Sequence, residues 1–163
     1  MVHIASGRST YRGLYPARFL ADQDLDQRHH RWREIQSDSE RNLVCVALDS
    51  RRHVVGFAVG HPVPRNQNGF ASERGAIYLL PRVQHRGFGR ALATAVVRAR
   101  RRRKLRSLIV WVLAKNPSRG FNEALGGRVV GTRRRTHGGV RRRETAYGWG
   151  DLRSEFDSRK PGN

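Results

Sequence analysis

The stretch Gln84–Arg90, which reads Gln-His-Arg-Gly-Phe-Gly-Arg, decides the fold of this chain of 163 residues. An apolar run, Ala76–Pro81, precedes it, and an apolar pattern with helical spacing, Ala91–Val97, follows it. A strand, a glycine turn and a helix are therefore expected in that order. This arrangement directs backbone N–H groups and the positive end of a helix dipole at one point, where phosphate binds well. The sequence predicts a cradle for a pyrophosphate group.

The glycines of the turn have a predicted role of their own. A side chain at Gly87 or Gly89 would keep an anion away from the amides, and Arg86 and Arg90 add positive charge. Two common nucleotide motifs do not fit: no Gly-x-x-x-x-Gly-Lys-Ser/Thr string occurs, and Leu92 stands where a Rossmann turn has its third glycine. The pattern that fits is Gln-x-x-Gly-x-Gly.

Length and composition predict one domain that buries its own core. The single cysteine, Cys45, excludes a disulfide framework and lies in an apolar run typical of a core strand. Residues Met1–Arg12 lack the apolar segment of a signal peptide, and no apolar run approaches the length of a membrane span. A cytoplasmic protein with no membrane contact is expected.

The charge of the chain is extreme. Lysine and arginine total 33 against 13 acidic residues, which gives a net charge of +20, and only three of the basic residues are lysines. Arginine suits phosphate groups through its planar fork, and a charge this high raises encounter rates with any polyanion. A genome that encodes arginine wherever a basic residue is tolerated would leave the same signature, so both interpretations stay open.

Periodicity and turn residues predict the remaining elements. Asn116 is expected to be the N-cap of a short helix, Pro117 its first residue and Gly126 its C′ residue. The expected helices are 1–13, 24–35, 87–103 and 117–125. The expected strands are 41–48, 53–60, 76–80 and 105–113, with a loop at 62–71 and a final hairpin that turns at 136–139.

In this order and spacing, the chain resembles the GNAT superfamily of acyl-CoA N-acyltransferases over roughly residues 11–151. Leu108–Leu113 resembles the fifth strand of that family, and Asn116–Gly127 resembles its Asn-Pro-x-x-x-Phe-Tyr-Glu-x-Leu-Gly helix. Val129–Gly131 and Ala146–Trp149 resemble the closing strands. The match is specific to the superfamily and not to a substrate.

The resemblance implies an α/β fold with a mixed, mostly antiparallel central sheet and helices on both faces. The segment that resembles the family's first helix starts almost at Met1, so the family's first strand is expected to be missing. Strand 41–48 would then form a sheet edge whose unpaired backbone groups invite a second copy, unless the sequence starts late. Residues 1–152 are expected to form one domain, and 153–163 a polar, disordered tail.

The resemblance also implies acetyl-CoA as co-substrate, with its pyrophosphate on the turn and its pantetheine along the strand before it. The residues that match family positions for coenzyme A are Tyr78, Leu79, Leu80, Gln84, His85, Arg86, Gly87, Phe88, Gly89, Arg90 and Asn116. For Asn116, capping of the helix is the simpler role, and both roles can hold because a cap uses one side of the amide.

For catalysis, the resemblance implies that the backbone N–H of Leu80 polarises the thioester carbonyl and that Glu73 acts as the base; a solvated surface role is the alternative for Glu73. The usual tyrosine acid of the family is replaced by Asn122. Asparagine cannot give up a proton, so the thiolate leaves unassisted, Tyr78 or Tyr147 substitutes, or the activity is weakened.

The acceptor is expected to be a primary amine on a small molecule, a protein or a tRNA, near Tyr11, Tyr15 and Trp32, with core packing as the alternative role for Trp32. No metal is expected, because His29 and His30 are adjacent on a helix and point apart. A competing hypothesis is a catalytically weakened protein that binds RNA through its basic runs. Those runs comprise Arg98, Arg100, Arg101, Arg102, Arg103, Arg133, Arg134, Arg135, Arg141, Arg142 and Arg143.

Overall fold

The computed structural model describes residues 2–17, 20, 25–67, 69–137 and 139–156. Its centre is a six-stranded sheet in the order β1-β2-β3-β4-β6-β5. The strands are β1 (Leu43–Leu48), β2 (Val54–Gln67), β3 (Phe70–Leu79), β4 (Leu108–Leu113), β5 (Arg128–His137) and β6 (Val140–Trp149). Every neighbouring pair is antiparallel except β3 and β4, which are parallel. The predicted mixed, mostly antiparallel sheet is confirmed.

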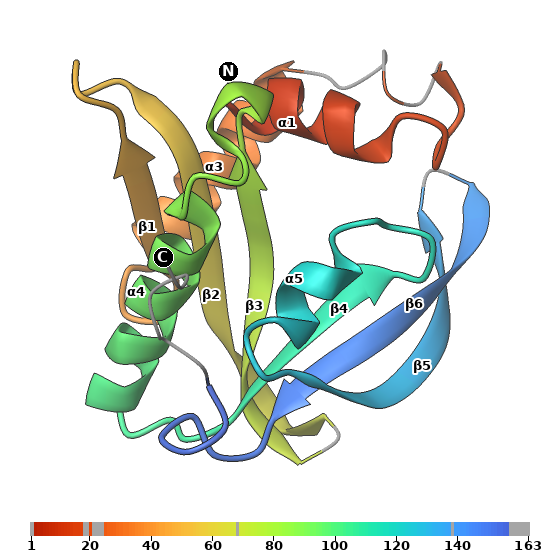
Figure 1. Ribbon diagram of the computed structural model, residues 1–163. Helices are drawn as coiled ribbons and strands as arrows, with labels where there is room; N and C mark the ends of the chain where they lie inside the picture. Colours follow the sequence, from red (N-terminus) through yellow and green to blue (C-terminus); the bar gives the residue numbers. More distant parts are fainter. Residues whose placement is uncertain (1, 18–19, 21–24, 68, 138, 157–163) are drawn as a thin grey trace.

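Helices cover both faces of the sheet, as predicted (Figure 1). They are α1 (Val2–Tyr11), α3 (Leu25–Ser37), α4 (Phe88–Arg102) and α5 (Arg119–Glu123), with a 3-10 turn, η1, at Pro81–Val83. Helix α4 buries a stripe at helical spacing that packs on the sheet, whereas α1 contacts β2 and β3 from the other side. In the part of the chain that the structure describes, no helix is both long and apolar enough to cross a membrane.

Two segments differ from the predictions. The expected loop at 62–71 is a hairpin, because Pro62 pairs with Ser72 and Gln67 pairs with Phe70. The sheet register shifts between these pairs, and such an irregularity is where a strand tolerates proline. The ordered core also extends to Phe156, which is only 8% exposed and stacks near Trp149, with ring centroids 6.0 Å apart. The rest of the expected tail lies outside the described residues.

The feature that positions the site is the divergence of β3 and β4. The two strands pair at a single position, Glu73 with Ile109, although both run on for several residues from it. In Figure 1 they lie together at one end and separate toward the other, with α5 beside β4. Strand β1 is an edge strand, and among the described residues no strand precedes it. Pairing of that edge with a second copy stays a prediction.

Candidate active site

The turn after β3 has the conformation that its glycines predict. The chain leaves η1 through an extended Gln84, enters the left-handed region at His85 (φ 59°) and again at Gly87 (φ 81°), and begins α4 at Phe88. Residues 85–87 are exposed. The first i to i−4 bond of the helix is that of the Ala91 N–H to the Gly87 carbonyl, at 3.0 Å. The N–H groups just before Ala91 therefore have no i−4 carbonyl partner within the helix, and no described side chain caps them.

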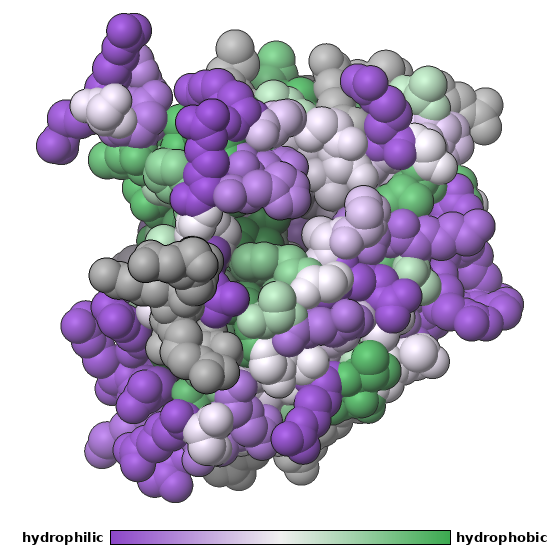
Figure 2. Space-filling view, viewed as in Figure 1, coloured by the Kyte–Doolittle hydropathy of each residue, from purple (hydrophilic) through white to green (hydrophobic). Residues whose placement is uncertain are grey.

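The two glycines of the turn serve different purposes. An added Cβ at Gly87 would meet no atom within 4 Å, so its left-handed φ is what favours glycine there. An added Cβ at Gly89 would lie 3.2 Å from the Phe121 ring and 3.5 Å from Leu79. Gly89 thus lets the start of α4 approach α5 and β3, which is a packing role that the sequence did not reveal. Figure 2 shows apolar side chains at the bottom of a hollow on this side of the molecule, surrounded by hydrophilic ones.

The backbone of β3 corrects one predicted contact. The N–H of Leu80 donates to the Val55 carbonyl of β2 at 2.9 Å, so it is not available to polarise a thioester. Successive residues of a strand direct their backbone N–H and C=O groups to opposite sides. Since those of Leu80 point toward β2, those of Leu79 point toward β4. The Gln84 side chain, which donates to the Leu79 carbonyl at 3.2 Å, agrees with this direction. Leu79, and not Leu80, presents its backbone to the gap between β3 and β4.

Helix α5 is anchored differently from the prediction. Its N-cap is Ser118, and Asn116 acts two residues earlier, where its Oδ1 accepts from the Ser118 N–H at 2.9 Å and from the Ser118 hydroxyl at 2.8 Å. The other end is as predicted. The Gly127 N–H bonds to the Asn122 carbonyl and Gly126 has a φ of 83°, which together form a Schellman ending. Arg90 reaches α5 as well and donates to the Ala124 carbonyl at 3.2 Å.

The residues considered as acids lie in contrasting surroundings. Asn122 is 1% exposed within α5. Tyr147 is fully buried; its hydroxyl donates to Glu123 at 2.6 Å and accepts from Arg119 at 2.9 Å. Burial, followed by the bond to Glu123, raises the pKa of Tyr147. The proton of Tyr147 is therefore held inside the protein.

The face of the sheet opposite α4 and α5 gathers polar side chains around Trp111, and we call it the Trp111 face. Val112 of β4 packs in the core with α4, so its neighbour Trp111 points the other way. Arg133 lies over the Trp111 ring, 3.9 Å from its centroid, and donates to Glu144 at 2.6 Å. Glu73 faces the same group, because Arg133 and Glu144 act on its charge.

The sequence suggested that Glu73 lies just before the strand. It lies inside β3 instead, and it is half-buried. Burial raises the pKa of the Glu73 carboxyl, and the nearby Arg133 and Arg135 oppose that rise. The Glu73 side chain is therefore partly shielded from solvent. A carboxylate with a raised pKa is a better proton acceptor at neutral pH than an ordinary one.

Tyrosines of the N-terminal segment close the Trp111 face. The Tyr11 and Tyr78 hydroxyls lie 3.0 Å apart, and the Tyr15 ring lies 5.8 Å from the Arg142 guanidinium. Trp32 instead packs against Phe57, with centroids 4.9 Å apart, so it belongs to an aromatic cluster between α3 and the sheet.

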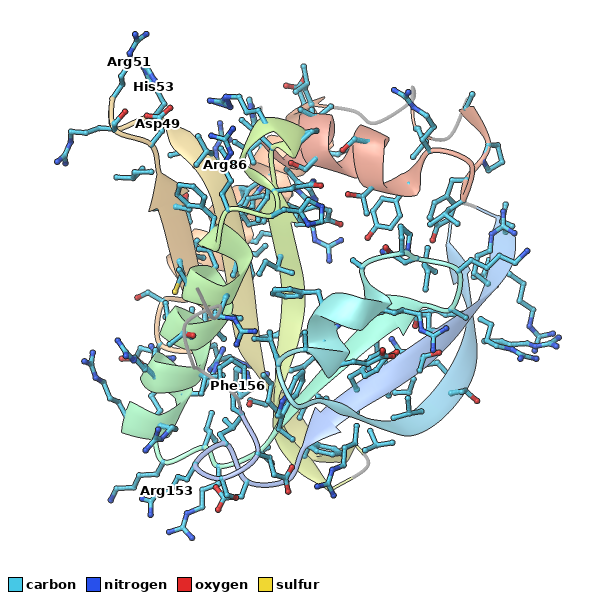
Figure 3. The ribbon with its side chains drawn as sticks, viewed as in Figure 1. Asp49, Arg51, His53, Arg86, Arg153 and Phe156 are labelled. Carbon is cyan, nitrogen blue, oxygen red and sulfur yellow. The ribbon has the colours of Figure 1, made fainter. Side chains whose placement is uncertain are left out.

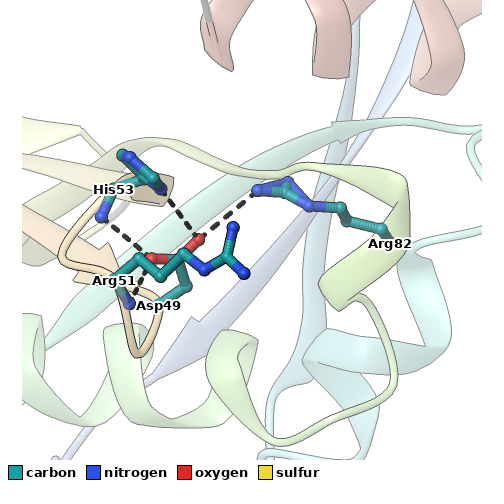
Figure 4. A network of polar contacts seen from close by, with 4 residues as sticks. All are labelled: Asp49, Arg51, His53 and Arg82. Carbon is teal, nitrogen blue, oxygen red and sulfur yellow. Dashed lines mark hydrogen bonds and ion pairs between the residues drawn. The ribbon is translucent and has the colours of Figure 1, made fainter.

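A polar network holds the turn between β1 and β2 beside the predicted cradle. The Asp49 carboxylate accepts from the backbone N–H groups of Arg51 and His53, at 3.0 and 2.9 Å, and lies 3.6 Å from Arg82 of η1 (Figure 4). The N–H of His53 is the largest of the causes that lower the pKa of Asp49. Figure 3 shows Arg86 at the same end of the sheet as this turn. The network links the start of the cradle to the sheet.

The basic runs are less uniform than the sequence suggests. Arg100 is fully buried under α4, against Gly60, and burial lowers its pKa to about 10, so it does not belong to any surface patch. Arg133 is paired with Glu144. Arg103 donates to the carbonyls of residues 39 and 40. The exposed remainder consists of Arg98, Arg101, Arg102, Arg134, Arg135, Arg141 and Arg143. RNA binding through them stays a prediction.

Sequence reasoning missed much of the Trp111 face. Glu144, Trp111 and the orientation of Arg142 follow from strand alternation once the register of β6 with β4 and β5 is known. Alternation within β6 was a usable signal, because Tyr147 and Trp149 are core residues and even-numbered positions then point away. The pairing of Tyr11 with Tyr78 spans 67 residues and had no local signal.

Comparisons with known proteins agree with this geometry. The family described as FR47-like protein matches residues 65–136. An uncharacterised N-acetyltransferase of Bacillus subtilis, YuaI, is 34% identical over 153 residues, which cover 93% of this chain and 85% of YuaI.

Solved structures give the same result for the fold. The PaiA N-acetyltransferase of Thermoplasma acidophilum, in complex with coenzyme A, superimposes with a TM-score of 0.73 at 16% identity and covers 90% of this chain and 87% of its own. A ribosomal-protein-alanine N-acetyltransferase of Brucella melitensis gives a TM-score of 0.62 at 25% identity, over 77% of this chain and 78% of its own.

Proposed function

The chain belongs to the GNAT superfamily of N-acetyltransferases, and from this premise we propose that it transfers an acetyl group from acetyl-CoA to a primary amine by direct attack. The observation that carries the proposal is the exposed turn at 85–87, which opens onto the uncapped N-terminus of α4. Backbone N–H groups and a helix dipole at one point favour a pyrophosphate. Arg86 adds a charge at the same end.

Acetyl-CoA would then extend from the cradle along β3. The gap between β3 and β4 leaves room for its pantetheine arm, and the Leu79 backbone would pair with it. A backbone N–H aimed at the thioester oxygen stabilises the charge that develops during attack; removal of one such donor typically costs about 10²–10³-fold in kcat.

The base in this proposal is Glu73. The amine nitrogen attacks the thioester carbonyl carbon, a C–N bond forms, the C–S bond breaks, and the ammonium proton passes to Glu73 directly or through water. The raised pKa of Glu73 and its position on the Trp111 face support this role. Glu73 is half-buried in β3 at the position where β3 and β4 pair, and the two strands diverge beyond it.

The departing thiolate receives no proton from a side chain in this proposal. Asn122 has no proton to give, and Tyr147 donates its own to Glu123. A thiolate is a fair leaving group without help, and the loss of a general acid slows such a step by about 10²–10⁴-fold without abolishing it. The rate should accordingly show no decrease at high pH of the kind that deprotonation of a tyrosine acid would cause.

A matched pair of variants tests the cradle. Gly87→Asp and Gly87→Asn have nearly the same shape, both residues tolerate a left-handed φ, and an added Cβ at this position meets no atom within 4 Å. Only the aspartate brings a negative charge among the amides. Calorimetric titration with acetyl-CoA should show much weaker binding for Gly87→Asp than for Gly87→Asn.

Equal affinity of the two variants would mean that the diphosphate lies elsewhere. Release of free thiol in the presence of an amine panel then tests catalysis separately from binding.

A further inference from the structure

The Trp111 face holds hydrogen-bond donors that no described residue satisfies. The Trp111 Nε1 and the Arg142 Nε are both buried, and neither has a hydrogen-bond partner among the described residues. Buried polar atoms are nearly always paired, so each such atom calls for an explanation. Both atoms can donate and neither can accept. A ligand that satisfies either atom must bring a hydrogen-bond acceptor.

The Trp111 face also carries an excess of positive charge. Glu144 is engaged by Arg133, at 2.6 Å. Arg135 and Arg142 lie directly opposite each other on β5 and β6, and in the described chain neither has an ion-pair partner. Like charges opposite each other across two strands destabilise a hairpin. An anion at this position would relieve the repulsion and also accept from the Arg142 Nε.

The unsatisfied donors lie close to the proposed base. Arg135 acts on the charge of Glu73, so the two side chains are within electrostatic reach of each other. Tyr15 covers the Arg142 guanidinium, and Tyr11 contacts Tyr78 beside it. The amine position and the anion position therefore lie on the same face of the sheet.

We propose that the acceptor is a free amino acid, whose amino group lies at Glu73 and whose carboxylate is held by Arg142 and Arg135, with the Trp111 Nε1 as a further donor. This inference rests on the proposed acetyltransferase function. Arginine suits a carboxylate because its planar fork can donate two parallel bonds. A polyamine is disfavoured, because its second cationic group would meet the two arginines.

The test uses matched acceptors. Free L-amino acids are compared with the corresponding decarboxylated amines and carboxamides, and phosphoethanolamine is compared with ethanolamine. Hydrogen bonds to a charged group are worth enough to change affinity roughly ten- to a hundredfold. The amino acids should therefore exceed their decarboxylated amines by at least about tenfold in kcat/KM. A preference for phosphoethanolamine over the amino acids, or for amines that lack an anionic group, would overturn the amino-acid assignment.

A pair of variants localises the effect. Arg142→Gln should raise KM for the amino acid at least about tenfold and leave KM for the decarboxylated amine unchanged. Arg143→Gln, one residue along on the opposite face of the same strand, is the matched control and should change neither. An unchanged ratio in Arg142→Gln refutes the carboxylate site.

Binding separates this inference from the proposed function. Calorimetric titration of the complex with coenzyme A, using the same amino acids, needs no catalysis. Binding that Arg142→Gln abolishes, without any acetyl transfer, would support the carboxylate site and refute the function. Acetyl transfer to simple amines, with no binding of amino acids, would support the acetyltransferase function and refute the carboxylate site.

Discussion

Gly89 joins the predicted cradle to the core, and its replacement by alanine tests that link. The added Cβ would lie 3.2 Å from one atom of the Phe121 ring and 3.4 Å from another. Phe121 is partly buried and packs against the main core cluster, so its ring can withdraw only by giving up contacts there. The start of α4 would have to move away from α5, and the turn at 85–87 would move with it.

Two opposing terms set the magnitude. Overpacking a filled site costs about 1–3 kcal/mol. Alanine in place of glycine within a helix returns about 0.5–1 kcal/mol. The free energy of unfolding of Gly89→Ala should therefore fall by about 0–2.5 kcal/mol, the difference of these ranges.

Urea denaturation provides the assay, with Gly120→Ala as the control. An added Cβ at Gly120 meets nothing within 4 Å, so that variant should gain about 0.4–1 kcal/mol. Phe121→Leu should reduce the cost of Gly89→Ala, with a coupling energy of at least about 0.5 kcal/mol. The reasoning fails if Gly89→Ala is as stable as Gly120→Ala, or if the two changes at 89 and 121 are additive.

Other consequences concern the Trp111 face and the helix ends. Glu73→Gln should lower kcat by about 10²–10⁴-fold. Burial raises the pKa of Glu73 in the folded protein above its ordinary value of 4.5. The stabilising contribution of the protonated carboxyl is therefore present below pH 4.5 and is lost as the pH rises through the folded pKa. Urea titrations at several pH values should show that Glu73→Gln removes this fall in the free energy of unfolding. Glu144→Gln weakens the 2.6 Å pair with Arg133 and should cost about 1–3 kcal/mol in the same assay. Tyr147→Phe should destabilise the protein by about 1 kcal/mol and leave the shape of the pH–rate profile unchanged, whereas loss of a basic limb would identify Tyr147 as an acid. Lys104→Gly should raise the melting temperature, because Lys104, the residue after the C-cap of α4, has a φ of 60°, a conformation that costs a residue with a side chain about 1–2 kcal/mol. An unchanged or lower melting temperature contradicts this.

Local chemistry made most of the fold predictable. The glycine turn, the apolar stripe of α4 and the Gly126 helix ending each depend on neighbouring residues, and each occurs where it was expected. The loop at 62–71 was predicted wrongly, because its prolines and asparagines indicate a turn whether or not the flanking strands stay paired. Only the pairing of β2 with β3 decides that question.

The site was less predictable, because it depends on contacts distant in sequence. The family pattern assigned the oxyanion contact to Leu80, but the Leu80 N–H is already taken by a hydrogen bond to Val55. Arg100 looked like one member of a basic run, yet helical periodicity puts it on the buried stripe with Val96 and Val97. That periodicity was visible in the sequence, whereas the neighbours of Arg142 depend on the register of the last hairpin.

The central claim is that backbone amides after β3 hold the diphosphate of coenzyme A. Backbone NMR of ¹⁵N-labelled protein, titrated with coenzyme A, tests it residue by residue. The amide signals of residues 85–90 and of Leu79 should shift most, and dephosphorylated pantetheine should leave those of 85–90 in place. If the largest shifts fall elsewhere, or if pantetheine alone reproduces them, the diphosphate does not bind at this turn.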